Sequence, residues 1–543
     1  MAKASKRQSL SEVFKSIANG VTGVFVFVIL TIFPLYTHNA YFDILGARYI
    51  FFKVWAILLC AILAMLGILY IVLDLQNQAS SPTALKRFID AFKPKNWKKY
   101  FIITDLFFII MIISMTISTI FSNFKEEAFF GIAGRYQGLE CWIMYFIAYI
   151  AITRTFKYKR LYLDFAILAG AFASIWGILD FFWLDPFHFF IGVSESQKSM
   201  FASSIGNLNT YTNYTIMIFA LAATLYILEK NNLKAIFYLI FSLIASIGTI
   251  CGFSDNAVLG FFGFYVIIPF FILKDRKKLI RYLITIDVLF LSIFIFYIAL
   301  QFPHNGYQGS FFIDLSNVSI ARYAFIPFTI MIVILYLIFK KFGPIDKPLP
   351  KAILLVYMAL LLIGFALVTY IILDMNVFKQ HVELWSKIPS SHQLIFDDNW
   401  GTHRGHNWRI AFTNYTQNFS LFQRLFGYGP DTYLIISERT FYEEMVSRYG
   451  EVYDSAHNEY INYLMCEGLI GLISYLGIFI SGIVTSLKKM NKNVFILAPI
   501  MAVIVYMVQA VVNIAIPITT PIFFTFLYIS VAAYFENNVY NIE

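Results

Sequence analysis

Charged residues and cysteine are scarce in this chain. Only 13% of its 543 residues are charged, against 59% that are hydrophobic. The four cysteines (Cys60, Cys141, Cys251 and Cys466) lie far apart in apolar stretches and form no CxxC pair, which indicates small core residues rather than a disulfide framework or a zinc site. The chain also lacks a DxD motif, so nothing indicates a divalent cation bound to a nucleotide sugar.

Long apolar runs are abundant instead. Runs of about 17 to 25 residues recur, and each can cross ~30 Å of hydrocarbon as a helix. In lipid every backbone amide must be hydrogen-bonded within its own segment, and the strands of a membrane barrel would be ~10 residues long and alternate in polarity. The sequence therefore predicts an all-α polytopic membrane protein.

We expect about fourteen transmembrane helices, with twelve as the lower bound. The predicted spans are 18–37, 49–73, 101–122, 138–153, 161–183, 209–228, 235–252, 257–273, 282–300, 323–340, 352–374, 461–486, 494–512 and 519–535. One long polar segment, residues 375–460, separates an N-terminal membrane region of about eleven helices (1–374) from a C-terminal region of about three (461–543). Loops of this length usually carry function, and the apolar patches in this one predict short helices.

Lysine and arginine are distributed unevenly between the two sides of the membrane. When successive loops are assigned to alternate sides, the loops on the side of the N-terminus hold 28 of the 41 Lys and Arg residues. Because basic loops are retained in the cytoplasm, we expect both termini there and the 375–460 segment on the extracytoplasmic face. The net charge of +9 follows from this bias and indicates contact with anionic membrane lipids, not with nucleic acid.

All eight histidines fall on the expected outer side, and His457 stands where the long loop re-enters the membrane. Histidine is the side chain best suited to proton transfer near neutral pH, which makes His457 a candidate catalytic residue. A simpler explanation is that polar residues gather in aqueous loops. His403 and His406 could instead join His457 at a metal, but an HxxH pair binds zinc only with further ligands, and we expect no metal.

Arginines form a second set of candidates. Arg135 and Arg322 lie at the outer ends of predicted spans, and Arg404, Arg409 and Arg424 lie in the long loop. The guanidinium group matches phosphate oxygens in bidentate geometry, so several arginines together could bind a diphosphate and stabilise it as a leaving group. The alternative is that each reaches from the apolar region to the interface without a substrate role.

Acidic residues inside the predicted spans support a rival hypothesis. Glu140, Asp287 and Glu467 are costly to bury in a membrane and are often functional there. They could belong to the ion pathway of a transporter, for example a flippase of lipid-linked sugars. Against this alternative, the chain shows no internal repeat of the kind that many transporters have, and a transporter gives no role to the long outer loop.

Four motifs follow one another in the second half of the chain. They are Trp408-Arg409-Ile410-Ala411-Phe412, Leu425-Phe426-Gly427-Tyr428-Gly429-Pro430, Ser455-Ala456-His457-Asn458-Glu459-Tyr460 and Glu467-Gly468-Leu469-Ile470-Gly471-Leu472. In this order and at this spacing the chain resembles the O-antigen ligase/polymerase family over about residues 405–475. Gly134-Arg135-Tyr136-Gln137-Gly138 and Gly206-Asn207-Leu208-Asn209 are fainter upstream matches. Where many members read "SR", this chain reads Ser254-Asp255, and Arg322 is our candidate to replace the missing arginine.

The resemblance implies a bacterial glycosyltransferase of the cytoplasmic membrane. Members transfer a glycan from undecaprenyl diphosphate on the outer face to a glycan, lipid or protein acceptor. The resemblance implies catalysis by His457 and Arg409 without cofactor or metal and with inversion, and a flippase is the alternative. The residues expected to bind substrate are Arg135, Arg322, Arg404, Asn458 and Glu467. Both a ligase and a polymerase fit this description.

Overall fold

The computed structural model describes residues 9–77, 80–306, 310–388 and 390–539, and these are almost entirely helical. The helices of the first half are α1 (Leu10–Phe27), α2 (Ile44–Asn77), α3 (Ala84–Ala91), α4 (Trp97–Tyr100), α5 (Ile103–Phe121), α6 (Lys125–Phe130), α7 (Leu139–Thr155), α8 (Leu161–Phe181), α9 (Glu195–Lys198), α10 (Leu208–Leu228), α11 (Asn232–Cys251), α12 (Asn256–Ile267) and α13 (Pro269–Ile272). Strands β1 (Phe201–Ala202) and β2 (Gly206–Asn207) pair antiparallel.

The second half continues in the same way. Its helices are α14 (Arg276–Ala299), α15 (Phe311–Asn317), α16 (Ser319–Arg322), α17 (Phe325–Lys341), α18 (Lys351–Leu373), α19 (Val382–Trp385), α20 (Trp400–Thr413), α21 (Leu421–Phe426), α22 (Tyr433–Thr440), α23 (Tyr442–Tyr449), α24 (Glu459–Cys466), α25 (Gly468–Leu487), α26 (Leu497–Gln509) and α27 (Thr520–Val539). Short π or 3₁₀ turns are η1 (Val28–Ile32), η2 (Phe33–Leu35), η3 (Pro94–Asn96), η4 (Ser203–Ile205), η5 (Asp374–Phe378), η6 (Ser391–Leu394), η7 (Asn414–Asn418) and η8 (Val494–Ile496).

Every predicted span coincides with helix in the structure. Within the described residues, nine helical stretches are long and apolar enough to cross a membrane. They are Leu10–Leu35, Ile44–Asn77, Ile103–Phe121, Leu161–Phe181, Leu208–Leu228, Asn232–Cys251, Arg276–Ala299, Lys351–Phe378 and Gly468–Leu487. The other five predicted spans are not among these nine stretches, so the polytopic helical class is confirmed and the count of fourteen is not supported.

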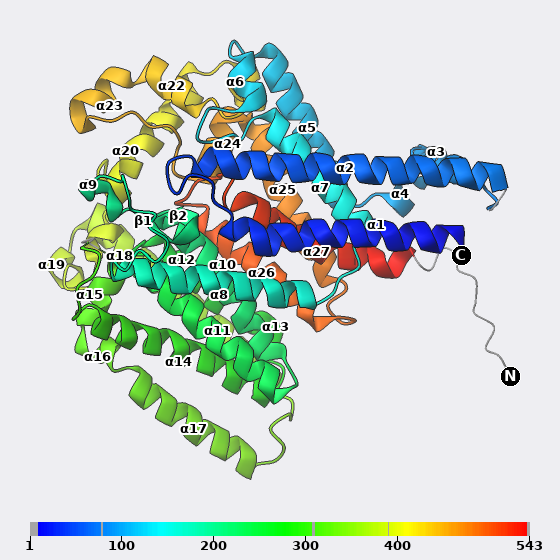
Figure 1. Ribbon diagram of the computed structural model, residues 1–543. Coiled ribbons are helices and arrows are strands. Elements are labelled where there is room, and N and C mark those ends of the chain that lie inside the picture. The colour runs from blue at the N-terminus through cyan, green and yellow to red at the C-terminus, as the bar shows by residue number, and fades with distance from the viewer. Residues whose placement is uncertain (1–8, 78–79, 307–309, 389, 540–543) are drawn as a thin grey trace.

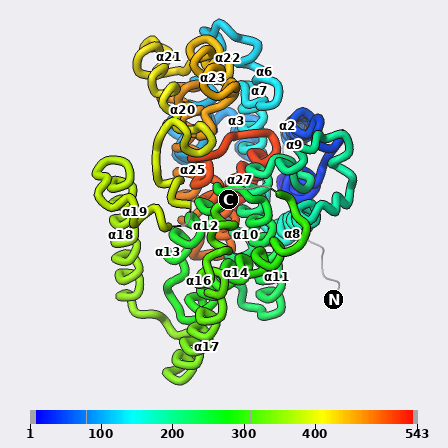
Figure 2. The backbone as a smooth tube through the Cα atoms, turned by 90° about the vertical axis from the view of Figure 1, so that its left-hand side faces the viewer, coloured from blue at the N-terminus to red at the C-terminus, as the bar shows by residue number. Residues whose placement is uncertain are grey.

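The long helices run roughly side by side, and the two ends of the bundle differ (Figure 1). α1 begins and α27 ends at one end, where α3 and α4 also lie. The short helices between residues 375 and 460 gather at the opposite end, beside α9 and the two strands. Figure 2 shows α17 and α18 at the edge of the bundle. In the most apolar stretch of α18, 0% of the residues are buried, whereas 100% are buried in that of α10.

The predicted span 461–486 consists of two helices, α24 and α25. Asn458 caps the first, α24, and its side-chain oxygen accepts from the backbone N–H groups of Tyr460 (3.0 Å) and Ile461 (3.1 Å). The break falls at Gly468, whose φ of +71° favours glycine. A Cβ there would lie 2.5 Å from the backbone nitrogen of Gly427, so two of the motifs pack backbone against backbone.

Candidate active site

α20 holds the backbone that leads into His457. The side-chain amide of Asn407 donates to the carbonyl of Ser455 (2.8 Å), and the indole of Trp408 donates to the carbonyl of Ala456 (2.9 Å). His457 itself has a φ of +48°, in the left-handed region. The motif around Trp408 therefore contacts the motif around His457. This contact fixes the backbone position from which the imidazole extends.

The His457 imidazole is partly buried, and its surroundings favour the neutral form of the ring. Its Nδ1 lies 3.4 Å from both the carbonyl oxygen and the hydroxyl of Ser455. When Nδ1 carries the proton and donates it to the carbonyl, the lone pair of Nε2 is available. Burial, together with the charges of Arg404 and Arg135, lowers the pKa of His457 to about 4, although Asp454 acts in the opposite direction. At neutral pH the ring is thus an acceptor of protons.

Asp431 positions the loop that carries Arg135. Its buried carboxylate accepts from the backbone N–H groups of Ile132 (2.9 Å) and Gln137 (3.1 Å), on either side of Arg135. Burial raises the pKa of Asp431 to about 7. The Arg135 guanidinium, whose side chain is only 12% exposed, pairs at 2.5 Å with the half-exposed carboxylate of Asp454. Asp431 directly follows the Leu425–Pro430 motif and was not among the site residues singled out from the sequence.

A small cavity of about 20 Å³ lies between Arg135 and the start of α24. Its walls include Asp431, Ser455, Glu459 and Glu467, and its size suits about one water molecule. Glu467 is 2% exposed, and its Oε2 has no hydrogen-bond partner among the described residues. The structure thus brings Arg135 and Glu467 to one cavity and places Arg404 where its charge reaches His457.

Comparison with known proteins identifies a family match in the same part of the chain. Residues 310–476 match the model of the O-antigen ligase family. After the family that it matches, we refer to residues 310–476 as the O-antigen ligase domain. It runs from α15 into α25 and contains all four motifs and His457. The resemblance seen in the sequence is confirmed, and the match supports a membrane glycosyltransferase of polysaccharide biosynthesis. No curated protein matches the chain.

Arg409 of the O-antigen ligase domain lies in an ion-pair network between α20 and α23. Its guanidinium forms a fork with Asp398 (3.0 and 3.2 Å) and also pairs with Glu444 (2.7 Å). Glu444 in turn contacts Nε2 of the fully buried His406 (3.0 Å), and Arg448 binds Asp398 (2.6 Å). These carboxylates raise the pKa of Arg409. These contacts connect Arg409 with acids of the domain, Asp398 and Glu444.

The other predicted residues have local partners. Arg322 donates to the carbonyls of Ser316 (2.9 Å) and Asn317 (3.0 Å), and its guanidinium lies 3.6 Å from the ring centre of Tyr297. Asp255, where many members read arginine, instead accepts from the backbone N–H of Phe311 (2.7 Å). In the structure, then, Arg322 binds the end of α15, and its role as a replacement arginine stays a prediction.

The remaining histidines and acids also pair locally. His403 contacts Glu451 at 2.7 Å, and within the described ranges no group of three or more His, Cys, Asp and Glu residues has the arrangement of a metal site. Glu140 pairs with Lys53 (2.7 Å) between α2 and α7, whereas Asp287 accepts from Thr329 (2.6 Å) between α14 and α17. The acids of the transporter hypothesis thus stand in separate helix pairs.

Proposed function

We propose that this protein transfers a glycan from undecaprenyl diphosphate to an acceptor hydroxyl on the outer face of a bacterial cytoplasmic membrane. The observation that carries the proposal is the match of residues 310–476 to the O-antigen ligase family, and His457 of this segment is within reach of the charges of Arg135 and Arg404. A base next to two guanidinium groups is the combination that a hydroxyl acceptor and a diphosphate leaving group require.

The arginines provide the site for the donor diphosphate. Arg135 is partly buried and held by a loop that Asp431 fixes, so its fork is preorganised. Its partner Asp454 is half exposed and can turn into water when phosphate oxygens replace it. Arg404 adds a second positive charge beside His457. Both charges stabilise the diphosphate more as it leaves than as it arrives, because negative charge builds up on it.

His457 activates the acceptor in a single displacement. Nε2 takes the proton of the acceptor hydroxyl while the acceptor oxygen forms a bond to the anomeric carbon. The bond from that carbon to the diphosphate oxygen breaks, and undecaprenyl diphosphate leaves with the electron pair, so the anomeric configuration inverts. The bound diphosphate offsets the charges of Arg135 and Arg404, and the pKa of His457 therefore rises in the donor complex, where a stronger base is needed.

The proposed orientation places both termini in the cytoplasm and the short helices outside. The excess of Lys and Arg on the terminal side supports it, as does the position of α1 and α27 at the end opposite the short helices (Figure 1). The substrate-binding roles of Arg322, Asn458 and Glu467 stay predictions.

The test is turnover by the purified full-length protein. With lipid-linked glycan extracted from cells that lack this protein, we expect release of undecaprenyl diphosphate and a transferred glycan. A polymerase forms a ladder with lipid-linked repeats as the only substrate, whereas a ligase forms product only after an acceptor is added. If the protein moves lipid-linked glycan across liposomes and releases no carrier, the transferase proposal is wrong and the flippase alternative replaces it.

Variants of Arg409 test whether its guanidinium group binds the donor or pairs only with acids of the domain. Arg409→Ala is expected to slow transfer ~10²–10³-fold. Arg409→Lys, which keeps the charge and loses the bidentate geometry, should remain clearly impaired. The matched control is Asp398→Asn, which removes the fork's main protein partner and leaves the arginine in place. Equal losses in Arg409→Ala and Asp398→Asn, measured as carrier release, would assign Arg409 a purely structural role.

A further inference from the structure

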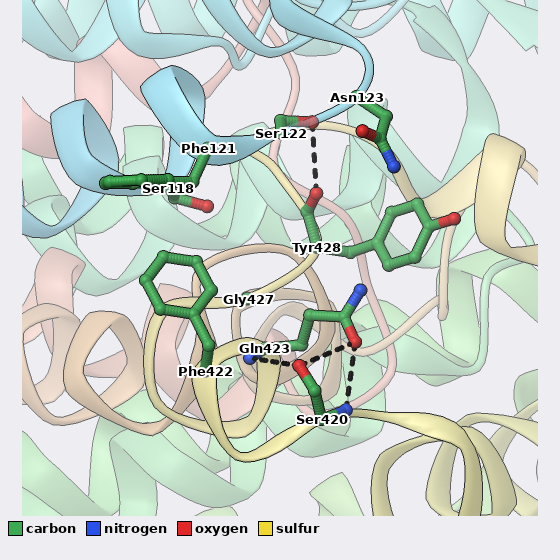
Figure 3. A pocket seen from close by; sticks show the side chains of 9 residues that line it. All are labelled: Ser118, Phe121, Ser122, Asn123, Ser420, Phe422, Gln423, Gly427 and Tyr428. Atoms are coloured by element: carbon green, nitrogen blue, oxygen red, sulfur yellow. Dashed lines mark hydrogen bonds between the residues drawn. The ribbon is translucent and has the colours of Figure 1, made fainter.

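A second, larger pocket lies between the end of α5 and α21 (Figure 3). Its volume is about 220 Å³, below the ~300–1,000 Å³ of pockets that hold drug-sized ligands. The rings of Phe121, Phe422 and Tyr428 line it together with hydroxyl and amide side chains, and no charged side chain is among its lining residues. Its size and neutral lining suit one small, uncharged, polar ring.

Two polar side chains of this lining have unused hydrogen-bonding capacity among the described residues. Ser118 is 1% exposed, and its hydroxyl has no hydrogen-bond partner among the described residues. In Figure 3 this hydroxyl faces the space between α5 and α21. Among the described residues, the side chain of Gln423 bonds only through its carbonyl oxygen, which accepts from Ser420 N (2.9 Å) and Ser420 Oγ (3.1 Å) in the cap of α21. That cap fixes the amide and turns its nitrogen toward Tyr428.

We infer that this pocket binds one neutral sugar residue of the glycan. A sugar ring offers C–H faces to aromatic rings and hydroxyls to amide and hydroxyl groups, and this pocket presents both kinds of partner. A buried hydroxyl without a partner is costly, and a ligand hydroxyl would remove that cost. The inference rests on the proposed function, because it takes the glycan of the transfer reaction as the ligand.

The pocket is connected to the candidate active site through one turn. Gly427 and Tyr428 form part of its wall. The backbone nitrogen of Tyr428 donates to the carbonyl of Met465 (3.1 Å) in α24, the helix that follows His457. The same turn ends at Asp431, which holds the Arg135 loop. A sugar in the pocket would thus be placed by the segment that also places the proposed diphosphate site.

The test compares two serines of α5 in the full-length protein. Ser118→Ala removes the hydroxyl in the pocket, and Ser114→Ala removes a buried, unpartnered hydroxyl one turn earlier that is outside the pocket lining. We expect Ser118→Ala to weaken binding of the neutral oligosaccharide released from its carrier ~2–10-fold, measured by calorimetry, with unchanged thermal stability. Ser114→Ala should bind as the wild type does.

Gln423→Glu is the second variant, because glutamate keeps the acceptor that caps α21, while it replaces the amide donor with a carboxylate oxygen and adds a negative charge to the neutral lining. It too should weaken binding. Wild-type affinity in both Ser118→Ala and Gln423→Glu overturns the subsite, and so does an equal loss in Ser114→Ala. Kinetics identify the source of the sugar: a raised KM for lipid-linked donor places the donor glycan in the pocket, and a raised KM for acceptor places the acceptor there. Oligosaccharide binding that depends on Ser118, without any transfer, would retain the subsite and reject the transferase.

Discussion

His457→Asn and His457→Ala are expected to lower glycan transfer by ~10²–10⁴-fold, the usual loss when a general base is removed. Asparagine is the sharper variant, because it tolerates the left-handed φ of +48° at this position and keeps a polar side chain without a basic nitrogen. The readout is release of undecaprenyl diphosphate by purified protein, compared at equal amounts of membrane-inserted enzyme.

The matched control is His403→Ala. His403 belongs to the same domain but contacts Glu451 and stacks on Tyr449, with 3.9 Å between the ring centres. Its loss should reduce transfer only mildly. Near-normal transfer by His457→Asn would remove the imidazole from the mechanism, and an equal loss in the two variants would point to a general weakening of the domain.

The helical spans could be predicted from the sequence because length and apolar composition determine them. The sequence could not predict which helices lie at the centre. Leu208–Leu228 and Lys351–Leu373 are both apolar. The most apolar stretch of the first helix is nevertheless fully buried, and that of the second is exposed. Lipid and protein interior favour the same side chains, so hydropathy does not separate them. The break at Gly468 escaped prediction because it depends on the approach of residues 425–427, which are distant in sequence.

The candidate site was predictable only in part, for a similar reason. His457 could be singled out because its residue type and its place at the membrane boundary are local properties. Its link with Arg135 depends on packing between segments more than 300 residues apart, which the sequence alone does not reveal. Asp431 was missed, since its importance comes from two backbone N–H groups of the distant loop 131–137. The ion pairs of Arg409 could not be predicted, because the sequence does not reveal that Asp398 and Glu444 lie close to it.

Arg135→Ala is expected to reduce kcat/KM for the lipid-linked donor ~10²–10³-fold, because one stabiliser of the leaving diphosphate is lost. The pH profile gives a second, independent readout. The charge of Arg135 lowers the pKa of His457, so its removal should raise that pKa and move the acid limb of the profile to higher pH. A merely structural loop residue would lower the rate without this shift.

Asp454→Asn is the control with the opposite sign. Asp454 raises the pKa of His457 and is also the protein partner of Arg135 at 2.5 Å. Its neutralisation should therefore move the acid limb to lower pH and should not weaken use of the donor as Arg135→Ala does, because Arg135 stays in place. The two limbs must move in opposite directions if Arg135, Asp454 and His457 form one electrostatic unit around the diphosphate. Shifts in the same direction, or none in either variant, would separate Arg135 from the proposed base and leave Arg404 as the arginine to test.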